Sequence, residues 1–278
     1  MSKSQFIIVP EWQGSSSSRA MRLVDGANAI LGDLPQSATR VVEIPTGAGD
    51  MVETGIARFT SLQSVRRAQA RVLAETPEPA ITIGGDCGVE LAAVEAAHAR
   101  HLGSMALVWL DAHADLNTPQ TSPSGTFHGM VLRALMGEAA PGLIPESGHE
   151  LLAEMVVLAG VRALDDAEDE FIASAGITVL TPAQLTDPQS LVRAIENTGA
   201  TSVYLHVDLD VLDPSDIAGV TYPEPFGVSA SDLTALIRAV RGRFPLVGAG
   251  ITEFAPASPN QAADDLPTIL RVIGALTS

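Results

Sequence analysis

Two apolar segments of this sequence each end in a dense group of acidic and histidine side chains. The first is Val108–Asp115 (VWLDAHAD) and the second is Tyr204–Asp213 (YLHVDLDVLD). Alternate residues of an extended chain point to the same side, so Asp111, His113 and Asp115 share one side at a spacing of roughly 6–7 Å. Burying such carboxylates without compensating charge would cost several kcal/mol each. The chain must therefore bind cations here, and the two groups together indicate a site for two hard divalent ions.

The remaining apolar runs predict a sheet covered by helices. Eight runs bounded by turn residues are expected to be strands, at 6–10, 41–45, 80–83, 106–110, 155–159, 177–180, 203–207 and 246–251. Helical patterns lie between them, at 64–74, 89–99, 165–175, 188–198 and 230–240. Hydrophobic residues make up 46% of the chain and aromatic residues only 4%, which is typical of parallel strands buried on both faces. We predict an α/β fold, a three-layer αβα sandwich with a mostly parallel eight-stranded sheet.

Composition limits the number of domains, the partners and the compartment. No linker-like stretch divides the 278 residues, so we expect a single domain, residues 1–278. A formal net charge of −17 argues against nucleic acid and anionic membranes, because phosphates need a basic surface. No apolar run reaches the roughly 18 residues of a membrane span, and no signal peptide is recognisable. A single cysteine cannot form an intrachain disulfide, so we expect a cytoplasmic protein. The sequence leaves the oligomeric state open, and a homo-oligomer is one possibility.

Polar motifs follow the predicted strands, and ligands of a parallel sheet bind beyond the carboxyl ends of its strands. Five motifs occur in order: GGDC (84–87), WLDAHADLNTP (109–119), SGTFHG (124–129), HVDLDVLDPS (206–215) and TEFAP (252–256). Together they resemble the ureohydrolase superfamily of arginase, agmatinase and formiminoglutamase. The resemblance implies an arginase-like fold and two Mn²⁺ ions that share a bridging hydroxide, which attacks a guanidinium carbon. The metal ligands that it implies are Asp111, His113, Asp115, Asp208 and Asp210.

The resemblance also gives His128 as a mobile proton shuttle and Glu253 as the partner of the guanidinium. A guanidine carbon is a poor electrophile, so the reaction needs hydroxide, which metal ions supply at neutral pH, and a proton for the leaving amine. His128 lies in a glycine-rich segment and titrates in the useful range, although it could also be a loop histidine with no role. Glu253 could pair with a guanidinium through two hydrogen bonds, or form a salt bridge with an arginine of the chain.

Two segments favour an α-amino acid as the small-molecule substrate. Residues 117–128 are similar to the arginase loop that holds the α-carboxylate and α-amino group; Asn117 and Ser124 match it, whereas Thr126 replaces the usual asparagine. Residues 162–168 resemble the arginase segment whose acids face the α-ammonium group, which nominates Asp165 and Glu168. The alternative for Glu168 is an ordinary acid in the first turn of a helix, stabilised by the helix dipole.

Cys87 departs from the family pattern, because arginases and agmatinases have a histidine ligand in GGDH. A thiolate is softer than imidazole and changes the net charge of such a centre from near −1 to about −2, which weakens the activation of water. Three interpretations remain open: a thiolate ligand, a small buried residue beside a half-occupied site, or the mark of an inactive relative.

With cysteine at this position, the sequence resembles a small branch of the superfamily that acts in the biosynthesis of the antibiotic D-cycloserine. That branch hydrolyses Nω-hydroxy-L-arginine to hydroxyurea and L-ornithine. An ordinary arginase, another ureohydrolase and a catalytically silent binding protein are the alternatives. His206, where many relatives have serine, is expected to pack behind Asp208 or to orient a ligand rather than to bind metal.

Overall fold

A sheet of eight strands forms the centre of the protein, whose residues 4–278 are described by a computed structural model. The strands are β1 Gln5–Val9, β2 Thr39–Val41, β3 Ala80–Gly84, β4 Met105–Leu110, β5 Val156–Ala159, β6 Thr178–Leu180, β7 Ser202–Asp208 and β8 Leu246–Thr252. Their spatial order is β2-β1-β3-β8-β7-β4-β5-β6, and all seven neighbouring pairs are parallel. The predicted eight-stranded parallel sheet is confirmed.

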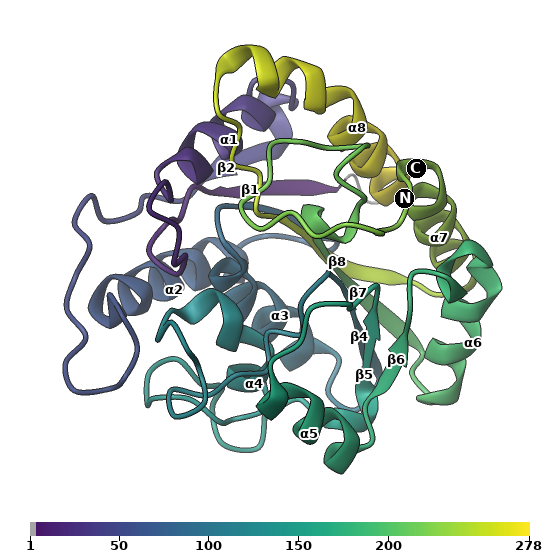
Figure 1. The fold of residues 1–278 in the computed structure, drawn as a ribbon, viewed down its shortest axis with the longest axis horizontal. Coiled ribbons are helices and arrows are strands. Elements are labelled where there is room, and N and C mark those ends of the chain that lie inside the picture. Colours follow the sequence, from purple (N-terminus) through teal and green to yellow (C-terminus); the bar gives the residue numbers. More distant parts are fainter. Residues whose placement is uncertain (1–3) are drawn as a thin grey trace.

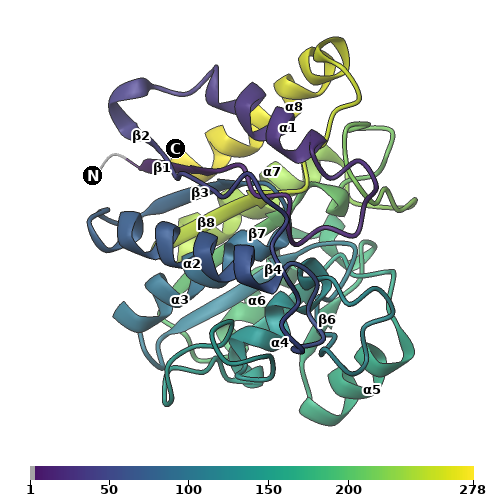
Figure 2. The same cartoon turned by 90° about the vertical axis from the view of Figure 1, so that its left-hand side faces the viewer.

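Helices cover both faces of the sheet, which confirms the three-layer architecture (Figure 1). The helices are α1 Arg22–Leu31, α2 Phe59–Ala74, α3 Glu90–Arg100, α4 Val131–Leu135, α5 Asp166–Ala175, α6 Pro188–Asn197, α7 Ala230–Arg243 and α8 Pro259–Thr277. On one face α1 packs against α8, α8 against α7 and α7 against α6, whereas α2, α3 and α4 cover the other face (Figure 2). None of the helices within residues 4–278 is long and apolar enough to cross a membrane.

The structure differs from the sequence prediction at one strand and three helices. Strand β2 pairs with β1 over Thr39–Val41, so the prediction of a strand at 41–45 is wrong in its bounds. The prediction followed the apolar run before Pro45, but the register with β1 starts two residues earlier. Helices α1, α4 and α8 were not expected. Pro267 lies inside α8, where a proline normally breaks a helix, and this disguises a regular spacing of buried residues.

Parallel pairing brings the polar motifs to one edge of the sheet. In the β4–β7 ladder Leu110 is paired with Val207, so the next residues, Asp111 and Asp208, emerge side by side. In the β7–β8 ladder Asp208 is paired with Thr252, and Glu253 follows directly. The β3 strand lies on the other side of β8 and leads into Cys87. Four adjacent strands therefore deliver the candidate site residues to the same place.

The chain after β8 is held in position by close packing against α1. A β-carbon built on Gly26 of α1 would lie 1.9 Å from the carbonyl oxygen of Phe254, the residue that follows Glu253. Only glycine allows this approach, because a methyl group would have to displace backbone. The contact links the helix layer to the position of Glu253.

We expect Gly26→Ala to destabilise the protein by about 1–3 kcal/mol, as overpacking in a tight contact does. Gly274→Ala in α8 is the matched control, since a β-carbon there meets nothing within 4 Å. An exposed helical alanine in place of glycine should be neutral or stabilise by up to about 1 kcal/mol. Urea unfolding of both variants measures the difference, and equal stabilities would contradict the close-packing argument.

Candidate metal centre

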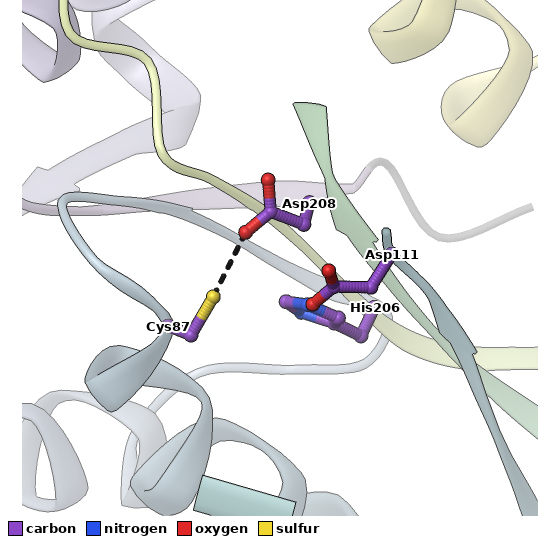
Figure 3. A group of neighbouring side chains, drawn as sticks. All are labelled: Cys87, Asp111, His206 and Asp208. Carbon is purple, nitrogen blue, oxygen red and sulfur yellow. Dashed lines mark hydrogen bonds and ion pairs between the residues drawn. The ribbon is translucent and has the colours of Figure 1, made fainter. Parts of the chain in front are cut away.

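Two groups of potential metal ligands share one aspartate at the carboxyl edge of the sheet. The first contains Cys87, Asp111, His206 and Asp208, and Figure 3 shows them converging from β7, the end of β4 and the turn after β3. The second contains Asp111, His113 and Asp210. Within each group the donor atoms lie within 4.8 Å of one another. Each group could hold one cation, and Asp111 belongs to both, so the residues fit the binuclear centre that the sequence indicates.

Backbone N–H groups orient the carboxylates. Asp208 ends β7 and caps the short 3₁₀ helix Leu209–Val211, so that its Oδ1 accepts a 2.8 Å hydrogen bond from the N–H of Asp210. Oδ1 of Asp210 in turn accepts one of 3.0 Å from the N–H of Ala112. The second oxygen of each acid faces its donor group: Asp208 Oδ2 lies 3.0 Å from the Cys87 Sγ, and Asp210 Oδ2 lies 3.0 Å from the His113 Nδ1.

Cys87 lies with its Sγ within 4.8 Å of the other donor atoms of the first group. It begins the 3₁₀ helix Cys87–Val89, and its side chain is 2% exposed. The thiol donates a 3.0 Å hydrogen bond to Asp208 Oδ2 and lies 3.5 Å from the Thr252 hydroxyl. Burial raises the pKa of the thiol, and the charge of Asp208 raises it further. Without a cation the neutral thiol is therefore favoured, and the ligand role of Cys87 stays a prediction.

Asp115 lies close to both groups but its oxygens are in neither of them. It has a left-handed backbone with φ of 53°, which costs about 1–3 kcal/mol in a non-glycine residue. Its carboxylate is buried, and Oδ2 has no hydrogen-bond partner within residues 4–278. Burial raises the pKa of Asp115, and the charge of Asp111 adds to that effect. A buried carboxylate with a strained backbone and one unpartnered oxygen is a feature of functional sites.

His128 is fixed at its backbone and stacked at its ring. It lies in the 3₁₀ helix Phe127–Met130, and its N–H donates a 3.1 Å hydrogen bond to the carbonyl of Gly14. Its ring stacks on Tyr222 at 4.9 Å between centroids, and Tyr222 also meets the His113 ring edge-on at 6.3 Å. Burial lowers the pKa of His128 to about 4, and the charge of His113 acts in the same direction. The imidazole is therefore neutral at pH 7.

Tyr222 was not singled out in the sequence. Its hydroxyl lies 2.6 Å from the Ser16 hydroxyl and 3.3 Å from that of Ser15. The serine-rich patch at residues 15–18 thus braces the ring that lies over the two histidines. Ser15 and Tyr222 are separated by more than 200 residues of sequence, so no local pattern could have revealed this role.

Glu253 is a buried acid without a partner. Its side chain is 1% exposed, its φ is 64°, and neither carboxylate oxygen has a hydrogen-bond partner within residues 4–278. Glu253 therefore forms no salt bridge with an arginine within residues 4–278, which was the alternative role for it. Burial raises the pKa of Glu253, and the charge of Asp86 raises it further. Such an acid is ready to receive a cationic or hydrogen-bond-donating ligand.

The residues expected at the other end of a substrate form two pairs. Asn117 Nδ2 donates a 2.8 Å hydrogen bond to Asp165 Oδ2, and the hydroxyls of Ser124 and Thr126 lie 2.6 Å apart. Glu168 instead accepts hydrogen bonds from the backbone N–H groups of Leu116 and Asp165, the second of which completes the capping box of α5. The structure thus gives Glu168 the role of a helix-cap acid, and its contact with an α-ammonium group stays a prediction.

The arginase family model matches residues 12–269, which is most of the chain. This chain belongs to the arginase family. It is 36% identical over 196 residues to the arginase of Bacillus caldovelox, an alignment that covers 65% of each protein. It is 38% identical over 157 residues to the arginase of Brevibacillus brevis, which covers 54% of this chain and 52% of the relative. The matched stretches thus span about half to two thirds of these relatives.

Solved structures of the family share the fold over the whole length. The arginase of Entamoeba histolytica, crystallised in complex with L-ornithine, superposes with a TM-score of 0.85 at 22% identity and covers 99% of this chain and 98% of its own. The proclavaminate amidino hydrolase of Streptomyces clavuligerus gives a TM-score of 0.73 at 22% identity, with 99% and 92% covered. The arginase-like fold expected from the motifs is confirmed.

The electrostatics of the centre predict how the metal-free protein responds to pH. Burial raises the pKa of Asp208, Asp115 and Glu253. The pKa of His113 is raised as well, because its hydrogen bonds to Asp111 and Asp210 outweigh the lowering effect of burial. A group with a raised pKa stabilises the folded state below its ordinary pKa, and this stability is lost as the pH rises through the folded value. The lowered pKa of His128 opposes this effect only below its ordinary value of 6.5.

We therefore expect the metal-free protein to lose stability as the pH rises above 6.5, the ordinary pKa of His113 and the value above which His128 no longer opposes the loss. Added Mn²⁺ should abolish the loss, because a cation replaces the protons. Thermal unfolding with chelator and with Mn²⁺ measures this. Asp115→Asn should weaken the pH dependence, whereas Asp33→Asn, which changes an exposed acid, should leave it intact. A metal-free protein equally stable across this range would contradict the repulsion argument.

Proposed function

We propose that this protein is a binuclear-metal hydrolase of guanidino α-amino acids, and that its substrate is Nω-hydroxy-L-arginine, which it cleaves to hydroxyurea and L-ornithine. The observation that carries the proposal is the pair of donor groups sharing Asp111, with the unpartnered carboxylate of Glu253 beside them. One cation would be held by the group of Cys87, Asp111 and Asp208, with Asp115 alongside, and the other by Asp111, His113 and Asp210. Family membership supports Mn²⁺ as the metal.

When bound, two divalent ions lower the pKa of water and polarise the group that is attacked. The chain's own residues do the rest. Glu253 receives the N–H groups of the guanidine, a planar donor that matches a carboxylate through two hydrogen bonds. Because Glu253 is buried and has no partner in residues 4–278, substrate binding satisfies a group that is costly to leave unmatched.

Residues around Asn117 and Thr126 are proposed to hold the α-carboxylate and α-amino group. The amide of Asn117 and the hydroxyls of Ser124 and Thr126 can donate hydrogen bonds to a carboxylate. Asp165, exposed at the rim and bonded to Asn117, offers a negative charge to an α-ammonium group. The two ends of the substrate are then held by two separate sets of residues.

His128 is proposed to move the proton that the leaving amine needs. Hydrolysis forms a C–O bond from water to the guanidine carbon and breaks the C–N bond to the side chain of the substrate. One water proton must reach the departing nitrogen to give the neutral amine of L-ornithine. An imidazole with a lowered pKa is neutral at pH 7, so it can accept this proton and release it readily.

Cys87 supports the hydroxylated substrate over L-arginine. A thiolate adds negative charge beside Asp208 and so makes the centre less activating. N-hydroxylation lowers the basicity of a guanidine, so a less activating centre is enough for it. The competing candidate is the ordinary arginase reaction, L-arginine to urea and L-ornithine, which the names of the relatives favour. A homo-oligomer, a cytoplasmic location and a place in antibiotic biosynthesis stay predictions.

A substrate comparison tests the reaction and the amino-acid end together. With Mn²⁺ supplied, we expect the highest kcat/KM for Nω-hydroxy-L-arginine and a lower value for L-arginine. Agmatine, which lacks the carboxylate, should be at least about 100-fold poorer than L-arginine, because sites built on hydrogen bonds reject analogues that lack the partner. Comparable values for agmatine and L-arginine would refute the assignment of Asn117, Ser124 and Asp165. Absence of turnover with all three would favour a silent binding protein.

Removal of a carboxylate from the centre tests the metal requirement. Asp208→Ala and Asp115→Ala should each lose bound metal and at least about 100-fold in kcat, since water is no longer activated. Asp169→Ala changes an exposed acid of α5 and should keep both properties. Metal content by elemental analysis and turnover are measured on the same samples. Full activity in either site variant would end the two-metal interpretation.

A further inference from the structure

His206 is a buried histidine whose ring nitrogens have no hydrogen-bond partner within residues 4–278. It lies on β7 two residues before Asp208, and its side chain is 0% exposed. Its ring stacks on that of Trp109, with centroids 3.5 Å apart and planes 23° apart, so the direction of both nitrogens is fixed. Figure 3 shows the edge of the ring pointing toward Cys87 and lying beside Asp111. An unpartnered imidazole aimed into a group of metal ligands needs an explanation.

The two nitrogens of His206 face different acids. Nε2 lies 3.5 Å from Asp111 Oδ2, on the side of the donor group, and Nδ1 lies 3.6 Å from Glu90 Oε2. Both separations exceed an ordinary hydrogen bond, so each acid is only loosely paired with the nitrogen that it faces. Nε2 is therefore the nitrogen that is available to a cation.

Glu90 is a second buried acid whose oxygens lack a well-formed hydrogen bond; its polar neighbours include His206 Nδ1 and the Tyr204 hydroxyl. It begins α3, its side chain is 0% exposed, and neither carboxylate oxygen has a hydrogen bond within residues 4–278. Space for it is made by Gly250 of β8, where a β-carbon would lie 1.9 Å from Glu90 Oε1. The absence of a side chain at Gly250 thus leaves room for an acid directly behind the histidine.

Histidines that bind metal through one nitrogen almost always donate the N–H of the other to a carboxylate or carbonyl, which fixes the tautomer. Glu90, His206 and the donor group have this order: acid, imidazole, metal ligands. We infer that His206 is itself a ligand, through Nε2, of the cation that Cys87, Asp111 and Asp208 would hold. In this arrangement Glu90 accepts a hydrogen bond from the Nδ1–H of His206. This inference rests on the proposed two-metal function and revises the expectation that His206 packs or orients a ligand rather than binding metal.

The assignment makes the two metal positions chemically different. The Cys87 position combines one sulfur, one imidazole nitrogen and carboxylate oxygens, a set that suits softer ions such as Co²⁺ and Zn²⁺. The position of His113 and Asp210 offers one imidazole and carboxylates, which suits Mn²⁺. Without His206, the Cys87 position would hold only anionic donors, and a neutral imidazole completes it without adding to the negative charge.

Cobalt titration tests the ligand role without measuring activity. The full chain, stripped by chelator and kept reduced, is titrated with Co²⁺ while native mass spectrometry counts ions and near-ultraviolet absorption follows the thiolate-to-cobalt band of Cys87. The wild type should bind two ions and show the band. In His206→Ser the ion beside Cys87 should bind at least about tenfold more weakly and the band should fade, while the other ion stays. Glu90→Gln should weaken the same ion by about 10–100-fold.

His98→Ser is the matched control, because it removes another buried histidine of the chain that belongs to neither donor group. It should keep both ions and the band. A rescue adds a test that packing would not satisfy: Cys87→His combined with His206→Ser restores an imidazole to the same group. Cobalt affinity at this position should then recover at least about tenfold relative to His206→Ser, without the band.

The outcomes separate the two proposals. Wild-type protein that binds no cobalt would defeat the two-metal function itself. Two ions in the wild type with unchanged affinity and band in His206→Ser would overturn only the ligand role of His206. If that variant does not fold, unchanged binding in Glu90→Gln overturns it, and so does a double variant that binds no better than His206→Ser.

Discussion

Repulsion among buried carboxylates at the carboxyl ends of β4 and β7 is the constraint on which the rest of the structure depends. Asp111, Asp208 and Asp210 are almost fully buried, and Asp115 lies beside them. Backbone N–H groups and His113 offset part of this charge, but burial still raises the pKa of Asp115 and Asp208. Strand β4 behind them is completely apolar, and it is paired in parallel with β7. This pairing keeps Asp111 and Asp208 next to each other. The fold holds the charges together and leaves cations to compensate them.

The sequence predicted what depends on local patterns and missed what depends on distant contacts. Buried strands such as Met105–Leu110 show as apolar runs, and strand direction then places Asp111 and Asp208 together without any structural knowledge. Helix α8 was missed because Pro267 interrupts an otherwise regular pattern. The groups around His206 and Tyr222 were missed because Glu90 and Ser16 approach them from elements far away in the chain. A single sequence carries no signal for such pairs.

Two of the six non-glycine residues with a left-handed backbone among residues 4–278 lie at the candidate site. Asp115 and Glu253 both have left-handed backbones, although neither is a glycine. Each directly follows or lies near a strand whose pairing is fixed, so a sharp local turn is needed to bring the carboxylate over the edge of the sheet. The cost, about 1–3 kcal/mol per residue, is borne by the packing around it. The close contact between Gly26 and Phe254 is one part of that packing, and it holds the chain immediately after Glu253.

The two donor groups differ in access as well as in chemistry. Cys87, His206 and Asp208 are fully enclosed, whereas the side chain of His113 is 31% exposed and faces the ring of Tyr222. His128 lies on this open side too, stacked on the same tyrosine. His113, Tyr222 and His128 therefore lie on the more open side of the centre, and Cys87 lies on its enclosed side. In the proposed function, Cys87 would act on the centre from its enclosed side, while the groups proposed to contact the substrate lie on the open side. A change at Cys87 or His206 would then alter the charge of the centre without touching Asn117, Ser124 and Thr126, the residues proposed to hold the amino-acid end.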